Sequence, residues 1–159
     1  MNIPALVRQA IAYCKLIPDE LITLIARFSI AAIFWKSGQT KIQGFAIDIV
    51  NGEFVLGIPR LSDSVVALFR EEYRLPILPP ELAATMAALA ENTLPVFILF
   101  GLATRFSALA LLGMTTVIQV LVYPDAYPTH GVWAVVLLFL ITRGPGKLSI
   151  DHLIAKRYP

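Results

Sequence analysis

Four long apolar segments constrain the fold of this chain more than any other feature of its sequence. They are apolar on all sides, unlike the single apolar stripe of a surface helix, and most are long enough to cross a bilayer. They cover residues 21–38, 82–102, 106–123 and 130–142, and the last one gains length if it starts near Tyr127. The sequence therefore predicts an all-α fold, a transmembrane four-helix bundle in a single membrane domain. A soluble helical bundle is the alternative.

The composition supports a membrane protein. Of the 159 residues, 57% are hydrophobic and 15% are charged, whereas about 25% of residues are charged in a typical soluble domain. The net charge of +2 is too small to indicate a nucleic-acid partner. The single cysteine, Cys14, excludes an intramolecular disulfide and a thiolate metal cluster. Residues 1–16 are not a signal peptide by pattern, because Arg8 and Lys15 interrupt the apolar run.

The distribution of lysine and arginine predicts the orientation in the membrane. With four spans, the basic residues near the two chain ends and between the second and third spans fall on one side. They are Arg8, Lys15, Arg105, Arg143, Lys147, Lys156 and Arg157. We therefore expect both termini in the cytoplasm, a cytoplasmic tail over residues 143–159, and an extracytoplasmic loop over residues 39–80.

The long loop carries signals of its own. Asn51-Gly52 and Ile58-Pro59 are typical of turns. Residues 61–73 predict a short amphipathic helix, with Ser62 as its N-cap and with Leu61 and Val66 as a hydrophobic staple.

Glu91 lies at the centre of the second span and Arg27 lies within the first. A carboxylate at that depth is costly and normally faces protein or a water-filled cavity. Arg27 is the expected partner, and the pair either takes part in chemistry or only pins two helices together. Pro95, four residues after Glu91, cannot donate to the Glu91 carbonyl, so we expect the span to bend there.

Further polar residues are expected near the outer ends of the spans. With Arg27 and Glu91 as a floor, they predict a buried polar pocket that opens outward, and they are Lys41, Gln119, Tyr123 and His130. His130 is a candidate proton relay or substrate contact, or simply an interfacial histidine. His152 falls on the other side of the membrane, so the two histidines cannot hold a haem together, and no metal site is expected.

The segment after the fourth span predicts a break and a new helix. Gly144-Pro145-Gly146 ends the span, and Ser149 is placed to cap a terminal helix over residues 150–157.

Three stretches of the chain together resemble the DoxX family of small membrane proteins. The first is LIARFSIAAIFWKSGQTKIQGF, with Arg27, Gly38 and Lys41. The second is LAENTLPVFILFGLATRFSALALL, with Glu91, Gly101 and Arg105. The third is GPGKLSIDHLI, with the motif residues Gly144, Gly146, Ser149 and Asp151. The resemblance implies a four-helix membrane bundle, and we expect a multi-pass protein of the bacterial inner membrane.

The resemblance implies function only in outline. Some members are subunits of thiosulfate:quinone oxidoreductase, and others are linked to redox or thiol stress. The first hypothesis is therefore an accessory subunit in redox or stress-related membrane chemistry, whose pocket binds quinone or a small anion. Arg27 or Lys41 would engage an oxygen, and Glu91 or His130 would move a proton. No residue is assigned as catalytic, and enzyme activity stays open.

The second hypothesis is a non-catalytic membrane partner or assembly factor, acting through a protein partner or a homo-oligomer. The stretch FREEYRLPILPPELAA is similar to members encoded beside metal-stress and peptide-modification genes. In that reading the loop residues Phe69 and Tyr73 would contact the partner. A small transporter is a third idea, but no pair of broken helices supports it.

Overall fold

The computed structural model describes residues 3–158. Within that range, four helices are long and apolar enough to cross a membrane, and the expected helical membrane bundle is confirmed. The four are α2 (Asp19–Gln39), α4 (Pro80–Phe100), α5 (Thr104–Leu121) and α6 (Tyr127–Arg143), the last preceded by a 3₁₀ turn, η2 (Pro124–Ala126). The fourth helix is longer than residues 130–142 and starts at the alternative position, Tyr127.

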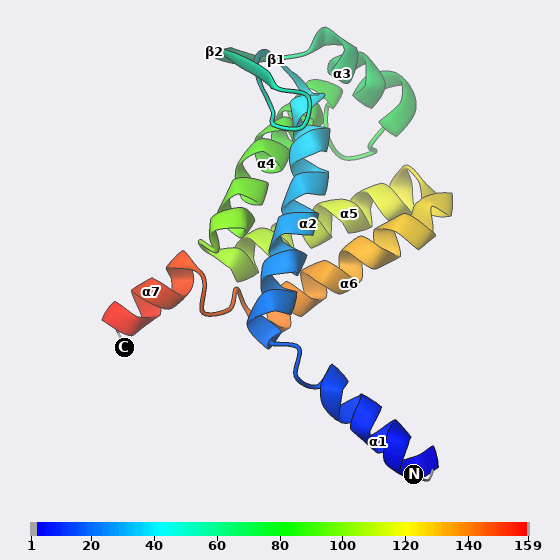
Figure 1. Cartoon of the computed structure of the whole chain (residues 1–159). Helices are drawn as coiled ribbons and strands as arrows, with labels where there is room; N and C mark the ends of the chain where they lie inside the picture. Colours follow the sequence, from blue (N-terminus) through cyan, green and yellow to red (C-terminus); the bar gives the residue numbers. More distant parts are fainter. Residues whose placement is uncertain (1–2, 159) are drawn as a thin grey trace.

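The four helices share one apolar core, and most of their remaining surface is apolar and exposed. Figure 1 shows α5 and α6 running side by side while α2 and α4 lie against each other. The largest buried side chains of the core come from all four helices and are Ile30, Phe34, Ile98, Leu111, Leu137 and Leu140. Only 17% to 33% of each spanning segment is buried. Such a thin core with an apolar exterior suits a bundle surrounded by lipid tails.

A β-hairpin follows α2 and was not predicted. It pairs β1 (Ile42–Asp48) with β2 (Glu53–Leu61) in antiparallel register. The turn at Asn51-Gly52 is confirmed, and Gly52 takes a positive φ of 70°. A turn at Ile58-Pro59 was wrong, because both residues lie inside β2. Pro59 lies opposite a register irregularity between Gln43 and Phe45, where a missing N–H is tolerated.

The predicted loop helix is present in two parts. They are α3 (Asp63–Leu68) and a π-helical turn, η1 (Phe69–Tyr73). Ser62 is the N-cap residue, but its side chain makes no capping hydrogen bond, and its hydroxyl lies 2.7 Å from that of Ser64. Val65 and Phe69 are buried against the first turns of α4. These contacts hold α3 on the bundle.

The two ends of the bundle are built differently. We call the end that carries the hairpin and α3 the hairpin end. The other, the terminal end, holds both chain termini. Figure 1 shows α1 (Ile3–Cys14) and α7 (Ile150–Arg157) projecting from it. The helix α1 is an element that no prediction covered.

Candidate functional site

A buried ion pair joins the turn after α2 to the middle of α4, near the hairpin end. Nζ of Lys41 lies 2.6 Å from Oε2 of Glu91. Glu91 is 3% exposed and Lys41 is 6% exposed. The same ammonium donates to the Ser37 hydroxyl at 3.0 Å and to the Ser37 carbonyl at 3.3 Å. Its three donors are therefore all used, and Glu91 is the partner that balances its charge.

The close approach of the two helices at this pair depends on Gly38. A Cβ at Gly38 would lie 2.7 Å from the carbonyl carbon and oxygen of Glu91. Beside it, the Asn92 amide donates to the Gly38 carbonyl at 3.0 Å, and Gln39 donates to Oδ1 of Asn92 at 2.7 Å. Gln39 also accepts from the N–H of Ile47 at 2.8 Å. This chain of amides ties α2, α4 and β1 together around the ion pair.

Arg27 is not the partner of Glu91, and the expected pairing was wrong. Its guanidinium is buried and donates to backbone carbonyls of two distant segments. The four accepting carbonyls are those of Ile98 at 2.9 Å, Leu99 at 2.5 Å, Pro145 at 3.1 Å and Leu148 at 2.6 Å. The last carbonyls of a helix have few internal donors, and the guanidinium fork donates to two of them, beside the N–H of Gly101 on the Ile98 carbonyl. Arg27 therefore belongs to the terminal end and does not form the expected floor together with Glu91.

The C-terminal motif closes the terminal end around Arg27. The Asp151 carboxylate accepts from the N–H of Ala103 at 2.7 Å and of Thr104 at 2.9 Å, so it caps α5. In return, the N–H of Asp151 donates to the carbonyl of Gly101 at 2.8 Å. A Cβ on Gly101 would lie 2.4 Å from Cβ of Ser149, and its φ is 68°. Only glycine fits there.

The other motif residues also act as parts of this closure. Ser149 accepts from the N–H of His152 at 3.1 Å, which confirms it as the N-cap of α7. Gly144 ends α6 with a φ of 83° and lies against the guanidinium of Arg105. Arg105 donates to the Ile141 carbonyl at 3.0 Å. The motif therefore organises the backbone of the terminal end and does not line the Lys41–Glu91 site.

Two further predicted residues meet at the hairpin end. Nδ1 of His130 lies 2.7 Å from Oε1 of Gln119, and the Gln119 amide donates to the Pro124 carbonyl at 2.6 Å. Because the Gln119 oxygen is an acceptor, Nδ1 carries the hydrogen, and Nε2 of a neutral His130 is left as the acceptor. Trp133 packs on the imidazole with ring centroids 5.0 Å apart.

Tyr123 connects the end of α5 to the π-helical turn. Its hydroxyl donates to the Glu72 carboxylate, and its ring meets that of Tyr73 edge-on at 5.6 Å. Burial, and then the adjacent Glu72 carboxylate, raise the pKa of Tyr123 well above its ordinary value. Burial likewise raises the pKa of Tyr73. The Tyr123 hydroxyl therefore stays protonated as a donor to Glu72 across the physiological range.

The structure thus brings Lys41 and Glu91 together, and Gln119 and His130 together, while Arg27 lies apart. Sequence reasoning missed Ser37, Gln39 and Asn92. The signal available for Ser37 and Gln39 was their place at the end of an apolar span, and the signal for Asn92 was its place beside Glu91. Pro95 lies buried inside a continuous α4, and the bend at Pro95 stays a prediction.

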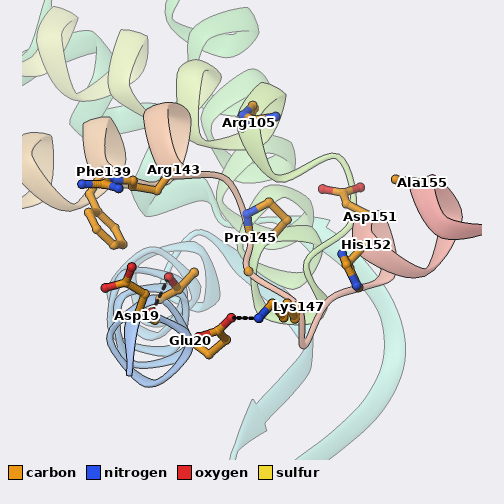
Figure 2. Close-up of a pocket in the computed structure, with 12 residues that line it drawn as sticks. Asp19, Glu20, Arg105, Phe139, Arg143, Pro145, Lys147, Asp151, His152 and Ala155 are labelled. Atoms are coloured by element: carbon orange, nitrogen blue, oxygen red, sulfur yellow. Dashed lines mark hydrogen bonds and ion pairs between the residues drawn. The ribbon is translucent and has the colours of Figure 1, made fainter. Parts of the chain in front are cut away.

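A cleft of about 540 Å³ lies at the terminal end, beside the start of α2 and away from the ion pair. Figure 2 shows Lys147, from the segment between α6 and α7, reaching Glu20 across the cleft. Nζ of Lys147 lies 3.0 Å from Oε1 of Glu20. The charged lining of the cleft balances: Asp19, Glu20 and Asp151 face Arg105, Arg143 and Lys147. No group of three His, Cys, Asp or Glu residues within 3–158 could hold a metal ion. The cleft therefore shows no preference for an ion of either sign.

Four apolar helices, with charged side chains buried between them, define a multi-pass helical membrane protein. More narrowly, the chain belongs to the DoxX family, whose sequence profile matches residues 22–124. It is similar to an uncharacterized protein of Haemophilus influenzae, with 30% identity over 158 residues, covering 92% of this chain and 93% of that protein. No solved structure matches the chain. The match spans α2 to α5 and so includes the Lys41–Glu91 site.

Proposed function

We propose that this protein is an accessory subunit in redox or stress-related membrane chemistry, and that the Lys41–Glu91 site binds a quinone head group or a small anion. The buried ion pair between α2 and α4 is the observation that carries the proposal. A charged pair at membrane depth is costly and marks a functional site by default.

The site has the parts that such a ligand needs. The 3.3 Å bond from Lys41 to the Ser37 carbonyl is the longest of its three, so it is the one that a ligand oxygen would replace. The ammonium would then donate to that oxygen, and Glu91 would accept or return the proton of a reduced ligand. His130, with Nε2 free as an acceptor, is a second proton carrier at the same end.

The test is whether quinone accompanies the purified protein. We expect the native chain, purified in mild detergent, to retain quinone that mass spectrometry detects in its lipid extract. Glu91→Gln should lose it, because the neutral amide no longer holds the ammonium or takes a proton. Lys36→Gln is the matched control, since Lys36 is an exposed lysine on α2 at the same end. If the native protein neither retains nor reduces a quinone analogue, the proposal fails.

We propose further that the protein lies in a bacterial inner membrane with its terminal end in the cytoplasm. The basic residues that predicted the orientation surround the chain termini and the α4–α5 link, where Asp151 and Lys147 hold the segments together. Positive charge of this kind favours the cytoplasmic side. Labelling of Ala12→Cys on α1, in a Cys14→Ser background, by a membrane-impermeant maleimide should therefore require opened cells. Labelling of intact spheroplasts would contradict the orientation.

A second candidate function, docking of a protein partner, is favoured by the surface of the hairpin. Phe54 is 63% exposed, Leu56 is 82% exposed and Ile58 is 79% exposed. Apolar side chains gathered in this way are typical of an interaction site. Phe69, by contrast, is buried in the core under α3, so the hairpin replaces it as the docking surface. The double variant Phe54→Ser with Leu56→Ser should abolish function in cells and leave quinone retention unchanged. If this double variant keeps its function in cells, while Glu91→Gln loses quinone, the result counts against docking.

A further inference from the structure

The helix α1 has an apolar face that no part of the described chain covers. None of its residues is buried. Ile3 is 77% exposed, Leu6 46%, and Val7 and Ile11 each 51%. Their spacing, with that of Cys14, places them on one side of the helix at about 100° per residue. An isolated helix of this length is marginal in water, so α1 needs a surface against which its apolar face can lie.

The opposite face of α1 is basic. Arg8 projects from it, Lys15 follows directly after the helix, and residues 3–15 contain no acidic side chain. A surface that covers α1 must therefore have two adjacent layers. One layer takes up the apolar side chains, and the next layer attracts positive charge. The acyl–headgroup boundary of an anionic bilayer has that layering.

The position of α1 puts that boundary within its reach. Residues 15–18 join it to α2, which begins at Asp19 and is a membrane span. At the same end, α7 exposes Leu153 and Ile154 and carries Lys156 and Arg157 in its last turn. The apolar face of α1 thus lies at the end of the bundle where basic residues collect.

From these observations we infer that α1 is an interfacial helix that binds the anionic lipid surface at the terminal end of the bundle. Its apolar face lies among the upper acyl chains, and Arg8 and Lys15 engage lipid phosphates. This inference is independent of the quinone proposal.

The single cysteine makes the inference directly testable. Cys14 lies on the apolar face and is exposed, so an environment-sensitive fluorophore can be attached to the otherwise native full chain. In vesicles of phosphatidylcholine with phosphatidylglycerol, we expect quenching by brominated acyl chains and protection from aqueous iodide. The matched control is Ala12→Cys in a Cys14→Ser background, because Ala12 lies on the opposite face. Its fluorophore should be quenched by iodide and spared by brominated lipid.

The charge requirement is tested by Arg8→Gln and Lys15→Gln. Each should reduce the ratio of lipid-bound to free α1 about fivefold in vesicles that contain phosphatidylglycerol, since one basic residue near an anionic surface is worth about 1 kcal/mol. Neither should change the ratio in phosphatidylcholine alone. Three results would overturn the inference: iodide quenching of Cys14 equal to that of Ala12→Cys, protection of Cys14 without quenching by brominated lipid (contact with protein), or unchanged binding in both charge variants.

Discussion

A lysine and a glutamate side chain are buried against each other between the end of α2 and the middle of α4. At 2.6 Å, Lys41 and Glu91 form a charge-assisted hydrogen bond. Both residues are less than a tenth exposed, so bulk solvent is a poor substitute for either partner if the other is removed. Removal of either residue should therefore lower the free energy of unfolding, because the other is left buried without a partner.

This dependence predicts a specific pattern of stabilities. Glu91→Leu and Lys41→Leu should each lower the free energy of unfolding by about 3–5 kcal/mol, because each leaves an unpaired buried charge. The double variant should lose less than either single variant, since no charge then remains. Unfolding in mixed detergent micelles, followed by circular dichroism, measures all three. A double variant as unstable as the sum of the singles would show that the two residues do not support each other.

At the scale of elements, close contact between α2 and α4 rests on the absence of a side chain. A Cβ at Gly38 would meet the backbone of Glu91, which cannot move aside as a flexible side chain could. On α5, by contrast, nothing lies within 4 Å of a Cβ at Gly113.

The same substitution at these two glycines should therefore change the free energy of unfolding differently. Gly38→Ala should destabilise the bundle by about 1–3 kcal/mol, the range for overpacking. Gly113→Ala should leave stability unchanged or raise it by up to about 1 kcal/mol, because alanine favours the helix. Melting temperatures in one detergent measure both. Equal effects at the two sites would contradict the close contact.

The hairpin has a turn that depends on ionisation. Oδ1 of Asp48 accepts from the N–H groups of Val50 and Asn51, each at 3.0 Å. These bonds, chiefly that from Asn51, lower the pKa of Asp48 below its ordinary value of 3.8. The ionised carboxylate therefore stabilises the turn above that pH, and the contribution is lost as the pH falls through the lowered pKa.

Acidification should consequently loosen the turn before it affects the helices. We expect the amide protons of Val50 and Asn51 to exchange faster, relative to their intrinsic rates, as the pH falls below 3.8 and through the lowered pKa of Asp48. In Asp48→Asn the acceptor oxygen remains but does not titrate, so this pH dependence should vanish. Its persistence in that variant would assign the effect to another group.

The helices were predictable from the sequence, and the hairpin and the partners of the charges were not. Apolar runs report spans directly, so α2, α4 and α5 were expected close to where they lie. The hairpin was hidden because Ile58-Pro59 has the pattern of a second turn, although both residues lie inside β2. The acceptors of Arg27 are backbone carbonyls, which every residue has, so no residue type in the sequence indicates them. Lys41 was recognised as polar, but its pairing depends on the depth that packing gives it.

For the whole molecule, the buried charges divide into two separate centres. Glu91 and Ile98, which respectively belong to the Lys41 and Arg27 clusters, are seven residues apart on α4, which is about 10 Å along a helix. The two centres share no hydrogen-bond partner among the described residues. One serves the hairpin end and the other closes the terminal end.

Variants of the two centres should therefore combine additively. Arg27→Lys keeps the charge but loses the fork that reaches four carbonyls, and we expect a clear fall in melting temperature. Combined with Glu91→Leu, the loss of unfolding free energy should equal the sum of the single losses within about 0.5 kcal/mol. Arg143→Lys, an exposed substitution at the terminal end, is the control and should be silent. A coupling well above that limit would mean that the two centres communicate.

The hydrogen bonds of Arg27 also set an order of events during biosynthesis. Two of its acceptors, the carbonyls of Pro145 and Leu148, come 118 and 121 residues later in the chain. At about 5–20 residues per second, the ribosome needs on the order of ten seconds to make that stretch. During that time the first span can already enter the bilayer while its arginine still lacks half of its partners. Residues that leave the ribosome long after the span of Arg27 thus complete the surroundings of its charge.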